Sequence, residues 1–572
     1  MAKTLPFPEY APDLTSLGTG VSGLIQNVTP RADGYGPVPD FVAFTLALPA
    51  NCRGFFFARK SDGSIATFAG TSTRLYLLNN TTFAWDDVSK GGAAYSTLVA
   101  SANWRFGQFN ELVIAVQVNT VPQKYTLNVG GAFANLGGSP PQAGTIAIVN
   151  RFVMLGKLLS NPRRAQWSDL DGPETWTAGV GFSDFQDLPD GGTVLGISGG
   201  DSYGIVFQED CIRTLTYAPG SPETFQINRL AAHDTLFAEY SIIPAGTRTF
   251  FCSAQGFKVI VAGGEPVSIG KERVDRTFFA DVDRNNLQLI QGATDPTATR
   301  VYWAYKSQSG LAGLFDKILC YDWSIGKNGQ WSLIRMSGQF LASLAKPGLT
   351  LEQLDAIAPG ALTVTGAANN GAGLIRLTLN AVSNAYFAIA GQNFIVVQGV
   401  VGTTEANGAW KVNIIDATHI DLVGSAFVNA WVSGGAIGGS LDALPFSLDS
   451  ISNAAVAQLS MISPTGMAGF FTGGNLEATL ETDEQDGEGN FIFIDGFMPM
   501  TDCATVMGSV GGRLSAQQSA PTYTAEAAVN SFGDCPITLE SQYLRGRVRM
   551  PAGATWSYAR GIQANAQLAG DS

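Results

Sequence analysis

The sequence has little charge and very little histidine. Asp, Glu, Lys and Arg make up 14% of its 572 residues, against roughly 25% in ordinary globular domains. Long amphipathic helices need many charged residues on their solvent face, so this composition favours an all-β protein. A catalytic Ser–His–Asp or Cys–His arrangement would have to use one of the only two histidines, His233 and His419. The absence of clustered histidine also disfavours a transition-metal site.

Cysteine is scarce and scattered, and no long apolar run is present. The six cysteines have no CxxC or other metal-ligand spacing, which predicts reduced, partly buried thiols rather than a disulfide scaffold or a zinc site. No run of about 18 apolar residues occurs, so no membrane-spanning helix is expected. The sequence lacks a charged stretch followed by an apolar one near residue 1, so we expect no signal peptide and synthesis in the cytosol. The cysteines are Cys52, Cys211, Cys252, Cys320, Cys503 and Cys535.

The net charge of −13 restricts the possible partners. A surface that grips nucleic acid must neutralise phosphates, and an acidic chain is poorly suited to this. A conduit through which DNA slides should instead repel phosphates, which net negative charge would do. Acidity that only aids solubility explains the composition equally well.

Glycine is abundant, and 45% of the residues are hydrophobic, which provides ample material for a core. Short apolar runs alternate with turn dipeptides such as Asp62–Gly63, Gly91–Gly92 and Asp190–Gly191. The repetition of strand, tight turn and strand is typical of radially repeated β-sheets, so we predict a β-propeller-like core. Short helices are expected only around 271–279 and 351–357.

Composition divides the chain into four parts. Residues 1–40, rich in proline, predict an extended N-terminal arm that lies along its own domain or a neighbouring subunit. Residues 41–359 predict the first part of the propeller core. Residues 360–440 lose nearly all charge and predict an inserted small β-domain, and residues 441–572 are expected to complete the propeller and add a C-terminal strand.

The insert contains a short pattern of its own. The stretch from Val400 to Ser425 resembles a small barrel-like β-insert of phage tail proteins, related to one in ubiquitin-activating enzymes. The resemblance implies a turn at Asn407–Gly408, a core position at Trp410 and a strand over His419–Leu422.

No catalytic motif stands out. HExxH, GxSxG, Walker A and a strand followed by GxGxxG are all missing. Paired carboxylates of the kind that glycosidases use occur in turns, where ordinary turn chemistry explains them as well. The carboxylates of the stretch from Asp483 to Glu488 could hold Ca²⁺, but the residue order of an EF-hand loop is missing, so an exposed acidic hairpin is favoured. The acids are Asp169, Asp171 and Glu174, then Asp281 and Asp283, and finally Asp483, Glu484, Asp486 and Glu488. We therefore predict no catalytic, cofactor-binding or metal-binding residues and no enzymatic activity.

Basic residues gather at three places only. Arg163 and Arg164 are adjacent, and a second group, Lys271, Arg273 and Arg276, includes Glu272. The third group, Arg545, Arg547 and Arg549, alternates with apolar residues and so shares one face of a strand. Such a row could blunt an exposed sheet edge or pair with acids of a neighbouring subunit, and the second alternative is favoured slightly.

Several stretches together resemble the tail nozzle, or tail hub, proteins of short-tailed bacteriophages (podoviruses). They occur in a consistent order over about residues 10–335. They are PDL, NVTPRADGYGPVP, RFVMLG, QWSDLDGPETW, QDLPDGGTVLGISGGDSYGIVFQEDCIRTLTY, SPETFQINRL, AQGFKVIVAGGEPVSIGKERVDRTFFADVD, DPTATRVYWAYKS and YDWSIGKNGQW.

The resemblance implies a structural protein of the virion tail, assembled in the host cytoplasm. It implies a homohexameric ring below the head-to-tail adaptor that retains and then ejects double-stranded DNA and supports fibres or spikes. The family has no catalytic residues to transfer. Two alternatives remain at this point: a propeller-type tail adhesin that binds or degrades glycan, and a tail fibre or baseplate adhesion protein.

Overall fold

The computed structural model describes residues 2–80, 83–345, 362–380, 394–416, 418–437 and 456–569. Within them the chain is built almost wholly of β-strands, and the one α-helix is α1 (Asp275–Asp281). The all-β prediction is confirmed. Helix α1 overlaps the helix predicted over 271–279, whereas the one predicted over 351–357 lies outside the described residues. No helix of the described part is long and apolar enough to span a membrane.

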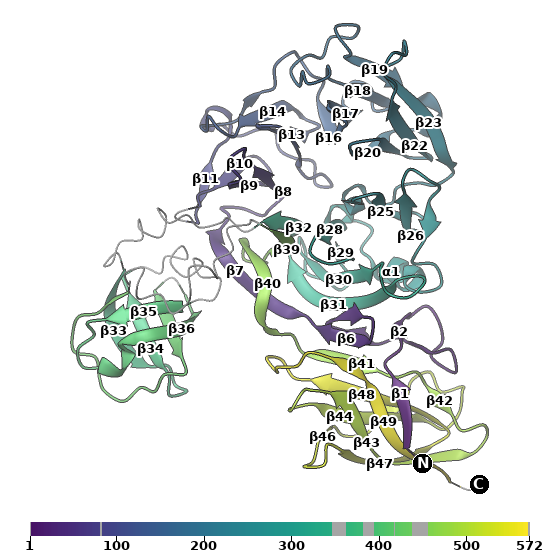
Figure 1. The fold of residues 1–572 in the computed structure, drawn as a ribbon, viewed down its shortest axis with the longest axis vertical. Helices are drawn as coiled ribbons and strands as arrows, with labels where there is room; N and C mark the ends of the chain where they lie inside the picture. Colours follow the sequence, from purple (N-terminus) through teal and green to yellow (C-terminus); the bar gives the residue numbers. More distant parts are fainter. Residues whose placement is uncertain are drawn as a thin grey trace.

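Seven four-stranded antiparallel units surround a common centre (Figure 1). Each of the first six is a meander of consecutive strands, numbered here as blades 1–6 in chain order. Blade 1 contains β8 (Phe55–Arg59), β9 (Ile65–Gly70), β10 (Leu75–Leu78) and β11 (Trp85–Asp87). Blade 2 contains β12 (Arg105–Phe109), β13 (Leu112–Gln117), β14 (Thr120–Thr126) and β15 (Ala134–Asn135). Blade 3 contains β16 (Ala143–Val149), β17 (Phe152–Leu158), β18 (Arg164–Trp167) and β19 (Asp184–Asp187).

Blades 4 to 6 continue this pattern through the middle of the chain. Their strands are β20 (Val194–Ser198), β21 (Gly204–Gln208), β22 (Cys211–Tyr217), β23 (Phe225–Ala232); β24 (Ile243–Ala245), β25 (Arg248–Ser253), β26 (Gly256–Val261), β27 (Val267–Ser268); and β28 (Gln291–Asp295), β29 (Arg300–Tyr305), β30 (Phe315–Asp322), β31 (Gln330–Gly338). First strands of neighbouring blades contact one another between blades 1 and 4 and from blade 5 onward, so these strands form the inner ring.

Blade 7 is assembled from three distant parts of the chain. Its order is β32 (Phe340–Ala345), β39 (Ala457–Ile462), β40 (Met467–Asn475) and β7 (Pro39–Ala47). The outermost strand therefore comes from the beginning of the propeller sequence, and β32 contacts β8 of blade 1. This pairing closes the ring, and the fold is a β-propeller with seven blades among the described residues.

The apolar core lies between the blades rather than in one central mass. A strand buried on both faces needs apolar residues at consecutive positions, and β9 is buried over its whole length from Ile65 to Gly70. Separate clusters of buried side chains join the neighbouring blades from 1 to 5, blade 6 to blade 7, and blade 7 to blade 1. The side chains between blades 5 and 6 belong to a larger cluster that also includes the arm and the sandwich. Each blade is thus stabilised by its two neighbours.

Strands that follow the propeller form a two-sheet sandwich with the N-terminal arm. One sheet has the order β47-β43-β49-β6-β5, with β1 on β49, and the other runs β4-β41-β48-β44-β45, with β42 on β48 and β46 on β44. The strands are β1 (Ala2–Pro6), β4 (Ile25–Gln26), β5 (Val28–Arg31), β6 (Gly34–Pro37), β41 (Ala478–Glu481), β42 (Gln485–Asp486), β43 (Phe491–Thr501), β44 (Met507–Arg513), β45 (Thr522–Tyr523), β46 (Ala527–Ala528), β47 (Cys535–Ser541), β48 (Tyr543–Met550) and β49 (Ala559–Ala569).

The arm joins the sandwich to the propeller. Strand β4 pairs with β31 of blade 6 on one side and with β41 on the other, so a single sheet runs through both units. A short parallel pair, β2 (Glu9–Tyr10) and β3 (Val21–Ser22), precedes it. Phe7, Tyr10, Ile25 and Tyr35 are buried in one cluster with side chains of blades 5 and 6, whereas Leu14 remains 42% exposed. The arm thus packs on its own chain, one of the two arrangements expected.

Sheet pairing divides residues 441–572 differently from the sequence expectation. Only β39 and β40, up to Asn475, pair within the propeller, and the strands from Ala478 onward lie in the sandwich. The apolar alternation of a strand is the same in either unit, so the sequence pattern could not separate them.

The insert is a closed barrel with a core of its own. Its strand order is β33-β34-β37-β36-β35-β38, and its buried cluster contains insert residues only. Asn407 holds the preceding loop through two hydrogen bonds with Val400, whereas Gly408 already begins strand β36. The partly buried Trp410 packs on the barrel core, as the resemblance implied. The strands are β33 (Leu362–Asn369), β34 (Ile375–Leu379), β35 (Phe394–Gln398), β36 (Gly408–Ile414), β37 (His419–Val423) and β38 (Ala436–Ile437).

Candidate functional sites

The acids of the 169–176 turn each hold a piece of backbone or a cation. Asp169 accepts hydrogen bonds from the backbone N–H groups of Leu170 and Phe182, at 2.9 and 2.7 Å. Asp171 pairs with Arg151. Glu174 reaches into blade 2, where it accepts from Lys124 at 2.7 Å. Each of the three acids therefore has a structural role, and no two of them form a carboxylate pair of the kind that glycosidases use.

Tryptophans close the same corner. Trp167 and Trp176 are each 3% exposed. Their indole N–H groups donate to the carbonyl oxygens of Phe182 and Pro173, both at 2.9 Å. The corner between blades 2 and 3 is therefore fixed by packing together with hydrogen bonds.

Asp281 and Asp283, at the end of α1, are both bound to lysines. Lys317 donates to Asp281 at 2.6 Å, and Lys306 donates to Asp283 at 2.9 Å. The hydrogen bond from Lys306 is the main reason that the pKa of Asp283 falls to about 2. A glycosidase acid must hold its proton near neutral pH, and Asp283 is arranged in the opposite way.

The acidic stretch 483–488 is not the exposed hairpin that the sequence favoured. The side chain of Glu484 is 1% exposed and binds Arg513 and Arg545, the latter at 3.0 Å. Asp486 and Glu488 are exposed, and Glu488 lies in the left-handed region at φ 53° in the turn that follows β42. The expectation failed because a buried carboxylate paired with arginines across the sheet is indistinguishable, in sequence, from a solvated one. In the described part of the chain no group of three or more His, Cys, Asp or Glu residues could hold a metal ion.

The arginine row of β48 shares one face, as predicted, but it does not blunt a sheet edge, and its arginines pair with acids of the same chain. Strand β48 lies between β41 and β44, so it is no sheet edge. Arg547 binds Glu481, and Arg549 binds Glu477 and Glu526, all within the chain. The pairing acids lie 23 to 72 residues away, beyond the reach of a local sequence pattern.

The other basic groups also fasten elements. Arg164 binds Asp187 of the next strand through two hydrogen bonds. Arg273 pairs with Glu9 of the arm, and Arg276 donates to the carbonyl oxygen of Asp13. The second basic group thus anchors the arm to blade 5.

Neither histidine has the surroundings of a catalytic base. His233 is 86% exposed and lies 3.5 Å from Asp210. His419 contacts the carboxylate of Asp416 at 2.8 Å in the turn that precedes β37. The backbone N–H of Thr418 is the main reason that the pKa of Asp416 falls to about 2. This contact is local and shapes a turn.

Asp275 is a perturbed acid that the sequence analysis did not single out. It is 7% exposed, and burial raises its pKa to about 6. One oxygen accepts the N–H of Phe257 at 3.0 Å, and the other has no hydrogen-bond partner. Gly256 and Gly270 leave room for this carboxylate, because a Cβ at either would lie about 2 Å from it. The glycines were the only signal in the sequence.

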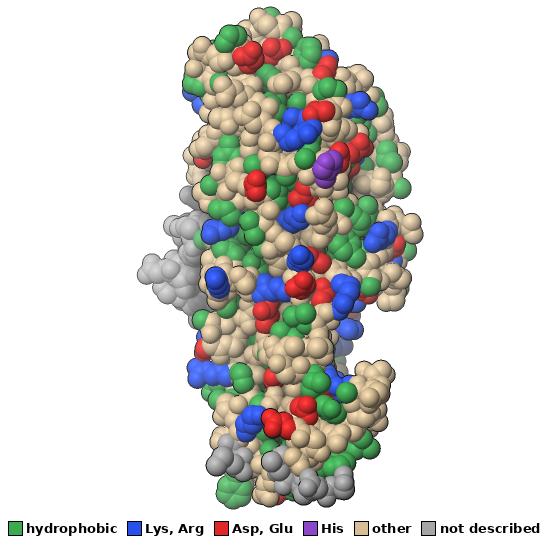
Figure 2. Space-filling view, turned by 90° about the vertical axis from the view of Figure 1, so that its right-hand side faces the viewer, with side chains coloured by type: hydrophobic (Ala, Val, Ile, Leu, Met, Phe, Trp, Pro, Cys, Tyr) green, Lys and Arg blue, Asp and Glu red, His purple; other side chains and the backbone are tan. Residues whose placement is uncertain are grey.

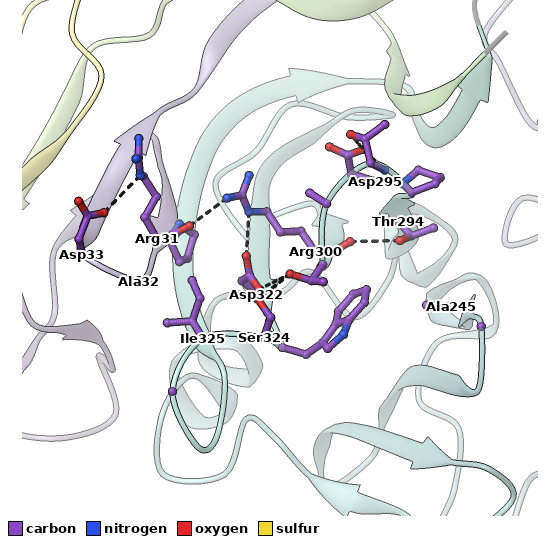
Figure 3. Close-up of a pocket in the computed structure, with 18 of the residues that line it drawn as sticks. Arg31, Ala32, Asp33, Ala245, Thr294, Asp295, Arg300, Asp322, Ser324 and Ile325 are labelled. Carbon is purple, nitrogen blue, oxygen red and sulfur yellow. Dashed lines mark hydrogen bonds and ion pairs between the residues drawn. The ribbon is translucent and has the colours of Figure 1, made fainter. Parts of the chain in front are cut away.

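A groove of about 1050 Å³ lies at one end of the propeller. Turns of blades 5 and 6 and the β5–β6 turn of the arm form its walls (Figure 3). Arg300 donates to Asp322 at 3.1 Å and to the carbonyl oxygen of Pro30 at 3.0 Å. Because Asp322 also accepts from Thr299 and Ser324, its oxygens are already occupied. Arg300 and Asp322 thus add polar groups to the groove, but they form no acid–base pair that is free to react with a ligand.

Charged side chains of both signs are interspersed on the face drawn in Figure 2. No broad stripe of positive charge of the kind that tracks a nucleic-acid backbone is visible there. The face therefore resembles an ordinary solvated protein surface.

No family model and no curated protein matches the chain. Among solved structures it is similar to the β-propeller domain of Cps50 (Swd1) from Myceliophteria thermophila, at 11% identity, with 50% of this chain and 80% of that chain covered and a TM-score of 0.29. It is also similar to the WD40 repeats of RRP9, at 8% identity, with 60% and 92% covered and a TM-score of 0.35. These likenesses concern the fold alone.

Proposed function

We propose that this chain is the nozzle subunit of a short-tailed bacteriophage tail. Six copies would form a ring below the head-to-tail adaptor, in the virion tail, around a channel that retains and then passes double-stranded DNA. Fibres or spikes would attach at its side. Its role would be structural, without enzymatic turnover.

This proposal rests on the contacts made by polar residues in the stretches that resemble nozzle proteins. Glu174 in QWSDLDGPETW binds Lys124 of the neighbouring blade. Arg273 in GKERVDRTFFADVD binds Glu9 of the arm. The polar residues of these stretches therefore tie elements together, as expected where a family shares a structural role.

Net charge supports passage of DNA rather than capture. Each subunit carries −13, and a channel wall of the same sign as the phosphates avoids the ion pairs that would hold DNA in place.

The assembled mass of the purified protein tests this proposal. Six chains of 60.2 kDa give a ring of about 361 kDa, visible by negative-stain microscopy and measurable by light scattering. The measurement should be made alone and with the purified adaptor complex, since docking can drive ring formation. A species of 60 kDa under both conditions that releases reducing ends from a bacterial polysaccharide would contradict the nozzle and support the glycan-directed adhesin.

A further inference from the structure

A small pocket between blades 5 and 6 is lined by four cations. Its volume is about 340 Å³, and Arg248, Lys271, Arg273 and Lys327 line it, with no aspartate or glutamate among the lining residues. A concentration of positive charge is unexpected in a chain of net charge −13. It is also separate from the groove of Figure 3, with which it shares only Trp323.

Different elements bring these cations together. Arg248 begins β25, Lys271 follows β27, and Lys327 lies in the turn between β30 and β31. Arg273 donates to the carbonyl oxygens of Asn328 and Gly329, at 2.8 and 2.6 Å, and so fixes that turn against blade 5. The convergence therefore depends on the packing of the two blades.

Three of the four cations have no counter-charge. Arg273 is paired with Glu9, whereas Arg248, Lys271 and Lys327 have no ion pair or side-chain hydrogen bond in the described part of the chain. Like charges held together repel one another, and a bound anion removes that repulsion. The pocket thus holds positive charge that the acids of the described chain do not neutralise.

Aromatic side chains form the remaining wall. Tyr321 is 4% exposed, and its hydroxyl donates to the carbonyl oxygen of Asn328 at 2.9 Å, so it is already engaged. Phe250 packs against Trp323 with ring centroids 5.2 Å apart. A wall of this kind excludes water from one side of the pocket, which strengthens the attraction between the cations and an anion.

We propose that this pocket binds the phosphate group of a small phosphate ester. A compact dianion suits a pocket lined by three unpaired cations, since several charged donors can contact its oxygens at once. A DNA backbone needs a long positive stripe instead, and Figure 2 shows none on the face it draws. The proposal is independent of the tail role, because it concerns one subunit.

Titration calorimetry with inorganic phosphate and with glucose 6-phosphate tests the assignment on the full chain. The double variant K271A/K327A removes two exposed cations of the pocket. The matched control R163A/K411A removes two exposed cations elsewhere that likewise lack side-chain partners in the described structure. We expect affinity for both probes to fall about tenfold or more in K271A/K327A, because charge-assisted contacts are the stronger ones. The control should bind like the wild type.

Two results would overturn the proposal. One is equal loss of affinity in both double variants, which would reduce the effect to net charge. The other is binding of a 20-base-pair DNA duplex but of neither small phosphate. Circular dichroism and thermal unfolding of each variant verify that the fold is retained, and the mass measurement above addresses the nozzle separately.

Discussion

At the scale of single residues, the carboxyl group of Asp275 is buried and forms no ion pair in the described part of the chain, unlike those of Asp281 and Asp283. Its pKa of about 6 lies above the ordinary value of 3.8. A raised carboxyl pKa means that stability is fully present below the unfolded pKa and is lost as pH rises towards the folded pKa. The loss amounts to roughly 3 kcal/mol by neutral pH.

Asp275→Asn should therefore abolish this pH dependence. We expect the variant to unfold with a higher free energy than the wild type at pH 7 and with a similar one at pH 4, measured by urea denaturation. Asp283→Asn is the matched control of opposite sign, since the Asp283 pKa is lowered to about 2 and its stabilisation is lost on acidification. A variant less stable at pH 7 than the wild type would contradict the account for Asp275.

Glu484, like Glu481, is a buried acid of the sandwich, and Arg513 and Arg545 both pair with it. Glu484→Gln leaves Arg513 and Arg545 without a carboxylate that they share. Removing one partner of a buried pair costs about 3–5 kcal/mol, because the other charge stays uncompensated. Chemical denaturation should show a loss of this order, whereas Glu488→Gln in the neighbouring exposed turn should change stability by less than about 0.5 kcal/mol.

At the scale of elements, the inserted barrel and the propeller have separate cores. Ala345 and Ala457 are paired at the ends of β32 and β39, on either side of the insertion. A short Gly/Ser loop can therefore replace residues 346–456 as a hairpin connection. We expect the shortened protein to retain its thermal unfolding temperature within a few degrees. A shortened chain that is insoluble or unfolded by circular dichroism would show that the insert supports the propeller.

Sequence patterns predicted strands well but could not predict their partners. The alternation in RGRVRM correctly placed three arginines on one face of β48, yet nothing local indicates that β41 and β44 flank it. Likewise, the pocket cations Arg248 and Lys327 lie 79 residues apart in sequence, and only the docking of blades 5 and 6 brings them together. Long-range pairing, rather than local propensity, decides these sites.

At the scale of the whole molecule, the ring depends on the pairing of β7 with β40. A Cβ at Gly469 would lie 2.2 Å from the carbonyl oxygen of Val42 and within 2.5 Å of the Phe41 ring. Gly469→Ala should therefore force these strands apart and lower the free energy of unfolding by about 1–3 kcal/mol. A Cβ at Gly474, in the same strand, would have only one neighbouring atom within 4 Å, the Cα of Gly553 at 3.5 Å. Gly474→Ala should be tolerated, and equal losses would exclude a specific effect on closure.

The number of blades could likewise not be predicted from the sequence. The turns indicated repeated β-sheets, but seven blades follow only when β7 is assigned to the same sheet as β32, β39 and β40. The C-terminal strands join the arm instead, because the arm supplies buried side chains such as Phe7 and Tyr35 that complete their core.

The closing bond also sets an order of events during synthesis. Ala468 donates its N–H to Thr45 across 423 residues of sequence. At translation rates of roughly 5–20 residues per second, Thr45 leaves the ribosome about 20–90 s before its partner exists. During this interval β7 is an unpaired strand on an open ring, able to pair with another nascent chain. Chaperone capture or slow, well-spaced initiation would therefore improve the yield of closed propellers.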